Sequence, residues 1–400
     1  MSDRDRPIRI AHLSDTHLGY AYRAFLRTDP VSGRNQRALD IEGAYEAAVT
    51  DILTRDVDLV IHAGDVFHHT RPTWHALRCF IRHSRRLEQA NLPYVVIAGN
   101  HDTARMRMSG TAFSVLELAL PETIFVTGEE SQSIGFEKLN LAVQAVPHGA
   151  VSGIMPTLPA PKSGMRNVLV THGMVPGLSI QGQHEPGEEV LSMTLLDAAF
   201  NYIALGHYHV GGRQGGNAWY SGSTERIGWG DEAVQPGYLI VTLGEPGAKP
   251  TVETVTLPAR PMRTMHPLAG DGRTARELAD LVLDRARAMG EPEAMTRIKL
   301  RDAPRPLRRE TEAILRRESS EVVWSLQVFT PGNILSPTTE RPERTAMGDL
   351  RTMFEAFVAE RTGPDYDREF AAAFLERGLR ALEEAEDAVE AIAASEDSAA

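Results

Sequence analysis

Short apolar segments that end in a glycine or in a group of polar residues recur along the first 245 residues of the chain. The segment VVIAGNHD, residues 95–102, is typical, because an apolar run leads directly into Gly-Asn-His-Asp. Amphipathic helical patterns at 38–55 and 73–89 separate the first of these segments. Apolar, β-branched runs that alternate with helices predict strands buried on both faces of a sheet. We therefore expect an α/β fold.

Later apolar runs follow one another with less helix between them. They lie at 139–146, 167–172, 202–207, 218–222 and 237–243. This half of the pattern predicts a mixed sheet or a second sheet packed on the first, and hence a layered α/β sandwich.

The rest of the chain predicts further domains. The stretch LPARPM, 257–262, indicates a boundary between a first domain at 1–258 and a small α+β cap domain at 259–330. Residues 331–345 are rich in Pro and Thr and predict a linker. Residues 346–390 predict a pair of amphipathic helices, and 391–400 an acidic tail. Two helices alone bury little of an apolar face, so we expect this pair to dock on a partner; the alternative is packing against their own domain.

The polar residues at the predicted strand ends are those that bind metals. They are Asp15 and His17, Asp65 and His68, Asn100 and His101, His172, and His207 and His209. In α/β sheets, ligands bind at the carboxyl ends of the strands. Asp15 with His17, and His207 with His209, are i, i+2 pairs, which project to the same side of an extended chain. The glycines before Asp65, Asn100 and His207 allow tight turns and close approach.

Seven potential ligands at these strand ends are too many for one tetrahedral zinc site. They suit two divalent ions that share a carboxylate, and the His/Asp/Asn mixture accepts Mn, Fe or Zn. Two such ions clamp a phosphate and activate water, which is the chemistry of phosphate-ester hydrolysis. We interpret four further histidines as ordinary surface residues: His12, His62, His148 and His184.

Composition excludes several other classes. The formal net charge of −12 argues against a generally basic nucleic-acid binder, although the Arg pairs at 308–309 and 316–317 leave room for a local basic groove. No apolar run is long enough to span a membrane, and the N-terminal residues lack the apolar core of a secretory signal. Cys79 is the only cysteine, which fits a reducing cytoplasm, and its helical setting predicts a buried side chain.

The ordered motifs resemble those of the calcineurin-like metallophosphoesterase superfamily. Within it, HLSDTHLGY, AGDVFHHTRPT, AGNHD, GHYH and SGSTERIGWGDE are similar to motifs of the SbcD family of DNA-repair nucleases, over residues 7–260. The resemblance implies a manganese-dependent nuclease subunit, with exonuclease and endonuclease activity, that hydrolyses phosphodiesters of double-stranded DNA ends and of single strands by a two-metal mechanism.

The resemblance also implies roles for individual residues. Asp15, His17 and His209 would hold one ion; Asn100, His172 and His207 would hold the other; Asp65 would bridge them. His101 would face the scissile phosphate and protonate the leaving oxygen. His68 would also point to the phosphate, or else make a structural hydrogen bond. Apart from the resemblance, it is a general expectation for working histidines that a carboxylate such as Asp102 orients His101.

The same resemblance implies partners and a location. The cap would contact DNA, the helix pair would dock on a coiled-coil ATPase of the SbcC kind, and the chain would form a homodimer, with residues 43–53 as the candidate face. It would work in the cytoplasm, at the nucleoid. Two alternatives stay open: a metallophosphoesterase for small substrates such as cyclic nucleotides, and a catalytically inactive DNA-binding scaffold.

Overall fold

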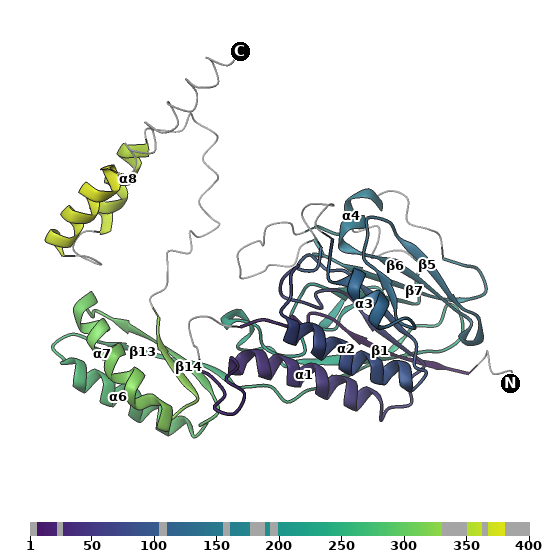
Figure 1. Cartoon of the computed structure of the whole chain (residues 1–400), viewed down its shortest axis with the longest axis horizontal. Coiled ribbons are helices and arrows are strands. Elements are labelled where there is room, and N and C mark those ends of the chain that lie inside the picture. The colour runs from purple at the N-terminus through teal and green to yellow at the C-terminus, as the bar shows by residue number, and fades with distance from the viewer. Residues whose placement is uncertain are drawn as a thin grey trace, which may run out of the picture. The chain divides into compact units, whose positions relative to one another are not determined.

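The computed structural model describes residues 6–21, 27–103, 110–154, 161–176, 189–192, 199–329, 350–361 and 367–380. The chain divides into two compact units, 1–262 and 263–400. Figure 1 colours the first unit from purple to teal and the second from green to yellow. The predicted domain boundaries stay a prediction.

Two six-stranded sheets form the first unit, with the strand orders β12-β11-β1-β2-β3-β4 and β5-β6-β7-β8-β10-β9. The strands of the first sheet are β1 (Ile8–Leu13), β2 (Leu59–His62), β3 (Tyr94–Ile97), β4 (Ile124–Val126), β11 (Gly237–Leu243) and β12 (Thr251–Thr256). Those of the second are β5 (Gln132–Phe136), β6 (Leu141–Val146), β7 (Arg166–His172), β8 (Tyr202–Gly206), β9 (Gly212–Gly215) and β10 (Ala218–Tyr220).

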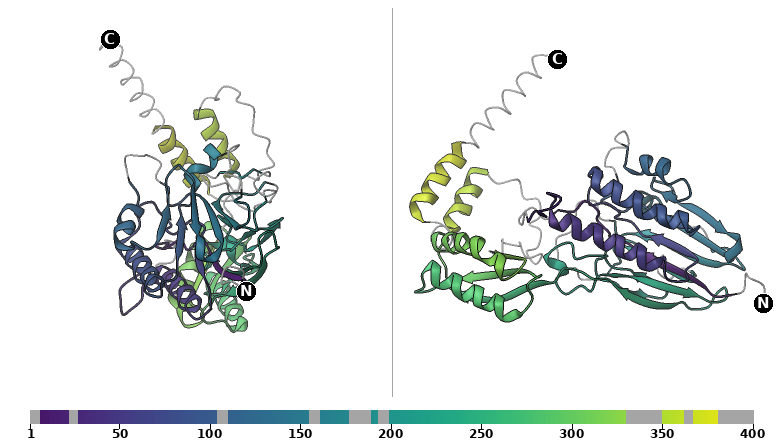
Figure 2. Two further views of the ribbon diagram at one scale, coloured as in Figure 1. Left: turned by 90° about the vertical axis from the view of Figure 1, so that its right-hand side faces the viewer. Right: turned by 60° about the horizontal axis from the view of Figure 1, so that its bottom comes forward.

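Helices cover the outer faces of these sheets. They are α1 (Gln36–Ile52), α2 (Trp74–Gln89), α3 (Phe113–Ala119) and α4 (His148–Ile154). Figures 1 and 2 show α1 and α2 side by side on one side of the strands. The side chain of Asn35 starts α1 by accepting hydrogen bonds from the backbone N–H groups of Arg37 and Ala38, which have no partner inside the helix.

The core of this unit has layers on both faces of the sheet, because successive side chains of a strand point to opposite faces. Ile8 and Ile10 of β1 pack between the two sheets, whereas Ala11 and Leu13 pack under the helices. A further apolar layer covers the outer face of the second sheet, beside α4. The predicted α/β sandwich with a second packed sheet is confirmed.

The direction of the strands decides where the site lies. β1 pairs with β2, and β2 with β3, in parallel. In the second sheet β7 and β8 are also parallel. Their carboxyl ends therefore meet at one edge of each sheet. Backbone hydrogen bonds join the loops there, from Asp15 N to Gly64 O at 3.0 Å and from His17 N to Asp65 O at 3.0 Å.

The second unit begins with a three-stranded sheet of order β13-β14-β15. Its elements alternate along the chain as β13 (Met262–Ala269), α6 (Ala275–Met289), β14 (Met295–Arg301), α7 (Arg305–Glu318) and β15 (Ser325–Val328). The alternation of strands with helices agrees with the α+β character predicted for residues 259–330. Thr274 and Glu277 form a capping box at the start of α6, and Gly290 ends the helix at φ 67°.

The expected C-terminal helix pair is described in part, as α8 (Leu350–Arg361) and a helical stretch at 368–380. The phenyl rings of Phe354 and Phe374 lie 5.6 Å apart between these two helices. The predicted linker 331–345 and acidic tail 391–400 lie outside the described residues.

Candidate metal centre

Five strands from two sheets deliver the predicted ligands to one place. Asp15 and His17 follow β1, Asp65 follows β2, and Asn100 follows β3. His172 is the last residue of β7, and His207 and His209 follow β8. Asp15, His17, Asp65 and His172 are almost fully buried. The structure brings all seven predicted ligands together.

The first group of ligands is Asp15, His17 and His209. Each offers one ligand atom, and these atoms all lie within 4.8 Å of one another. Nε2 of His17 lies 3.1 Å from Nε2 of His209, so both rings turn a nitrogen to the same point. This is the set that was predicted to hold one ion.

The second group centres on Asn100, whose Oδ1 lies 2.9 Å from Nε2 of His172 and 3.2 Å from Nδ1 of His207. Asp65 stands between the two groups. Its Oδ2 lies 3.5 Å from Nε2 of His172 and 3.6 Å from Nε2 of His17. One carboxylate oxygen at nearly equal distance from both groups is the arrangement expected of a bridging ligand.

Backbone strain concentrates at these residues. Asp15 (φ 52°), His17 (φ 43°), Asp65 (φ 54°) and His207 (φ 112°) are four of the seven non-glycine residues with positive φ among the described residues. Such conformations cost about 1–3 kcal/mol each and cluster at functional sites. The expectation of an extended i, i+2 projection is therefore wrong, because the chain turns sharply at each pair.

Glycines permit this close packing, as predicted. A Cβ on Gly99 would overlap the carboxylate of Asp65, and one on Gly206 would overlap the carbonyl oxygen of Ala63. Gly64 has φ +93°, and a Cβ there would lie 2.5 Å from Nδ1 of His172. The loops can bring their ligands this close only because these three residues have no side chain.

The electrostatics of the site suit bound cations. Burial would raise the pKa of Asp65, but the imidazoles of His172 and His17 outweigh it and hold this pKa well below its usual value. Burial raises the pKa of Asp15. Burial would lower the pKa of His172, but the carboxylate of Asp65 raises it to about 9. The carboxylates thus draw positive charge to this edge, and divalent cations satisfy the same demand.

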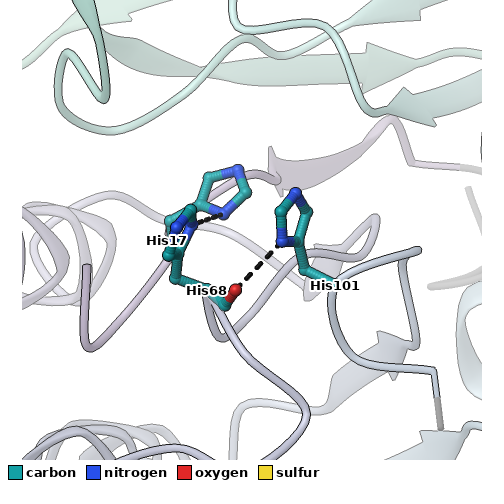
Figure 3. Close-up of side chains that lie close together, drawn as sticks. All are labelled: His17, His68 and His101. Carbon is teal, nitrogen blue, oxygen red and sulfur yellow. Dashed lines mark hydrogen bonds between the residues drawn. The ribbon is translucent and has the colours of Figure 1, made fainter. Parts of the chain in front are cut away.

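His68 and His101 form a third group with His17, shown in Figure 3. Nδ1 of His101 lies 3.0 Å from the carbonyl oxygen of His68, and the backbone N–H of His101 donates to Oδ1 of Asp65 at 3.0 Å. Nδ1 of His68 lies 3.3 Å from Nδ1 of His17. Both rings therefore stand beside the ligands, and the carbonyl of His68 directs the ring of His101.

Asp102 has partners other than the expected one. Its carboxylate accepts hydrogen bonds from the backbone N–H groups of Val66 and Phe67, both at 2.9 Å, and of Gly99 at 3.1 Å. These hydrogen bonds brace the loop after β2 against the loop after β3. The prediction that Asp102 orients His101 is corrected accordingly, because its carboxylate binds main-chain groups and Nδ1 of His101 meets the carbonyl of His68.

Sequence reasoning missed Asp231. Its Oδ2 accepts a hydrogen bond from Nδ1 of His209 at 2.8 Å and from the backbone N–H groups of Ile227 and Gly228 at 2.8 and 3.2 Å. Burial would lower the pKa of His209, but the Asp231 carboxylate raises it to about 9. A carboxylate behind a metal-binding histidine fixes the direction of its ring. The motif SGSTERIGWGDE contains Asp231, but the sequence does not show that this residue contacts His209.

Three of the four histidines interpreted as surface residues are not on the surface. His12, His62 and His148 are buried, and His184 lies outside the described residues. Nδ1 of His12 lies 2.8 Å from the Tyr202 hydroxyl, and Nε2 of His62 lies 3.1 Å from the Thr16 hydroxyl. Burial lowers the pKa of both His12 and His62 to about 3. Their structural role stands, but their predicted exposure is wrong.

The donor set fits two divalent cations. It combines imidazole nitrogens with carboxylate and amide oxygens, the mixture that first-row metals accept.

Among the described residues, none of the helices is long and apolar enough to cross a membrane. Cys79 is buried, as predicted, and burial raises the pKa of its thiol to about 12.

Comparison with known proteins agrees with this geometry. The sequence profile described as calcineurin-like phosphoesterase matches residues 8–211. A protein of Haloferax volcanii named DNA double-strand break repair protein Mre11 is 30% identical over 298 residues, 73% of this chain and 61% of the relative. Proteins of the same name from Halobacterium salinarum and Saccharolobus solfataricus are 30% and 28% identical, over 58% and 50% of this chain and 56% and 49% of theirs.

The chain thus spans about half to three fifths of the length of these relatives. Among solved structures, the NAD nucleotidase of Haemophilus influenzae aligns with a TM-score of 0.32 and 12% identity, over 79% of this chain and 60% of that one. A TM-score this low does not establish a shared fold.

Proposed function

The chain belongs to the calcineurin-like phosphoesterase family. From this membership we propose that it is a metal-dependent DNA nuclease subunit that hydrolyses phosphodiester bonds. It would act as an exonuclease and an endonuclease, at double-stranded ends and in single strands. The shared Asp65 carries the proposal, because it lies between two complete groups of ligands. The name of the relatives, a DNA double-strand break repair protein, supports DNA as the substrate and repair as the role.

The residues of the site would divide the work as follows. Asp15, His17 and His209 would hold one cation, Asn100, His172 and His207 the other, and Asp65 both. Two bound cations, for which we propose manganese, would neutralise the phosphate and lower the pKa of the attacking water.

His101 would act on the other side of the phosphorus atom. The carbonyl oxygen of His68 lies against Nδ1 of His101. Because a carbonyl oxygen only accepts a hydrogen bond, Nδ1 carries a proton and donates to it. Nε2 of a protonated His101 would then donate to the leaving sugar oxygen. The hydrogen bond from His101 N to Asp65 ties this donor to the shared ligand, so that the ring and the cations keep one spacing. The His68 ring would face the same phosphate.

We also propose a homodimer, but the exposed apolar side chains favour a different interface from the expected residues 43–53. Within residues 43–53 the larger apolar side chains of α1 turn inward, since Tyr45, Val49 and Ile52 are buried. The exposed apolar side chains lie elsewhere: Trp74 of α2 is 81% exposed and Leu118 of α3 is 85% exposed. We therefore propose that the dimer forms through α2 and α3.

The C-terminal helices would dock on the coiled-coil ATPase. Phe357, Phe370 and Phe374 are 44%, 41% and 40% exposed, an apolar surface that a partner of this kind would cover. With a DNA substrate, the chain would act in the cytoplasm, at the nucleoid.

The test uses the purified chain, linear duplex DNA with labelled ends, and manganese. We expect degradation that a chelator abolishes. Asp65→Ala should lose both metal binding and cleavage, and His101→Ala should lose cleavage and keep metal binding. Lys138→Ala, an exposed residue before β6, should change neither.

Two outcomes would refute the proposal. Hydrolysis of a cyclic nucleotide without hydrolysis of DNA would favour the small-substrate alternative. DNA binding with no cleavage, even with the ATPase added, would favour the inactive scaffold.

A further inference from the structure

All the charged side chains on the strands of the second unit's sheet are basic. The strands β13, β14 and β15 contain no Asp or Glu, and they carry Arg263, His266, Arg297, Lys299 and Arg301. The acids on the helices number three on α6 and three on α7. A protein with a net charge of −12 thus keeps a sheet whose strands hold no acidic residue.

The two faces of this sheet differ. Ile298 and Leu300 of β14 pack with α6 and α7, which contact each other, in the core of the unit. Because side chains alternate along a strand, Arg297, Lys299 and Arg301 lie on the opposite face. None of these three is buried. Both α6 and α7 pack on the apolar face, so neither covers the basic one.

An aromatic ring lies among these basic groups. Phe329 follows β15, and the guanidinium of Arg297 stands over its ring, 4.7 Å from the centroid. Nε of Arg297 donates to the hydroxyl of Thr264 on β13 at 2.8 Å. Gln327 pairs with Arg297 across the β14–β15 register and shares this face. The planar guanidinium and the ring are therefore held in one orientation.

We propose that this face, defined by Arg297, Lys299, Arg301, Gln327 and Phe329, binds single-stranded DNA. Bases that are not paired can stack on an aromatic ring or on a guanidinium plane, and sheets with such groups are common single-strand platforms. Lys299 and Arg301 are about 7 Å apart along the strand, a spacing suited to successive phosphates of an extended chain. The inference rests on the proposed nuclease function, which yields an unpaired strand at an opened DNA end.

The Arg-rich helices of the same module fit this role less well. On α6, Arg276 pairs with Asp280 and with Glu318 of α7. On α7, the basic residues alternate with Glu310, Glu312 and Glu318. Phosphate would meet a surface of mixed sign there, whereas the strands of the sheet contain no acidic residue.

The test measures the fluorescence anisotropy of a labelled oligothymidylate with the full chain in EDTA, so that nothing is cut. Lys299→Gln with Arg301→Gln should weaken binding and make its dependence on salt shallower, by about one unit of slope for each phosphate that the variant no longer neutralises. Phe329→Leu should weaken binding by about five- to hundredfold, the range for loss of one stacked base. The matched control is Arg316→Gln with Arg317→Gln, two exposed arginines of α7.

Several results would overturn the proposal. They are an unchanged affinity in the sheet variants, an equal loss of affinity in the α7 control, or an equal loss of affinity of the sheet variants for a blunt-ended duplex, whose bases are all paired. Manganese-dependent hydrolysis of bis(p-nitrophenyl) phosphate tests the proposed nuclease function separately from the proposed DNA-binding face, because the small diester needs only the metal centre. Sheet variants that are folded should hydrolyse it at the wild-type rate, whereas a wild-type chain that hydrolyses neither it nor DNA would refute the nuclease function.

Discussion

The carboxylate of Asp102 offers a sharp test of how the metal centre is built. Its two oxygens accept three hydrogen bonds from buried backbone N–H groups, those of Val66, Phe67 and Gly99. Asp102→Asn keeps the shape of the side chain but replaces one oxygen with an NH2 group. Oδ2 accepts two of the three bonds and Oδ1 accepts one, so either orientation of the amide points a donor at a donor.

The expected cost follows from this count. At least one buried N–H group loses its partner, which costs about 1–3 kcal/mol. For a unit of this size, about 2 kcal/mol lowers the melting temperature by about 4–8 °C. The loops that carry Asp65 and Asn100 also lose their brace, so manganese affinity should fall in parallel. Differential scanning calorimetry in EDTA and titration calorimetry with manganese measure the two effects.

The exposed Asp271→Asn in the second unit is the matched control and should change neither quantity. The reasoning would be refuted if Asp102→Asn melted like the wild type and bound manganese normally but cleaved DNA slowly. That pattern would mean that Asp102 acts on His101, as the sequence had suggested.

Three further outcomes are expected. Asp231→Ala removes the acceptor behind His209 and should weaken manganese binding about 10–100-fold by titration calorimetry, with the fold intact by circular dichroism. Gly99→Ala should abolish metal binding because the new Cβ overlaps Asp65, whereas Gly43→Ala, with open space on α1, should stabilise the chain by about 1 kcal/mol. Manganese at a hundred times its dissociation constant should stabilise the protein by about 2.7 kcal/mol per site in thermal melts, and a chelator should reverse this; melting that ignores manganese would contradict the proposed sites.

Much of the candidate site was predictable because its ligands come from local patterns. A strand such as β3 is readable from its apolar run, and the polar residues after it mark its carboxyl end. Parallel strands bring such ends together without further information. The strands that the pattern missed in the first unit were β4, β5, β9 and β12. The residues of β5 and β9 are mostly exposed or half-buried, so apolar content gave little signal.

Contacts between distant segments were not predictable in the same way. Asp231 reaches His209 from the segment before β11, and Asp102 binds the loop after β2 through main-chain groups that no motif reveals. His12 is buried because the second sheet packs on its face of β1, where the hydroxyl of Tyr202 of β8 meets its ring. His62 alternates with Ile61, which packs between the sheets, so it lies on the other face of β2, beside the hydroxyl of Thr16. Burial of this kind depends on which faces meet, and the side-chain pattern of one strand does not specify its neighbour.

The linear pattern was enough to specify the α/β sandwich and the identity of the ligands, because strand and helix periods and strand-end residues are local properties. The packed chain was needed to place Asp65 between two groups, to turn the backbone through positive φ at Asp15 and His207, and to bring Arg297 of β14 against Phe329 and Thr264. These features come from the register and packing of elements far apart in the chain, which a linear pattern does not encode.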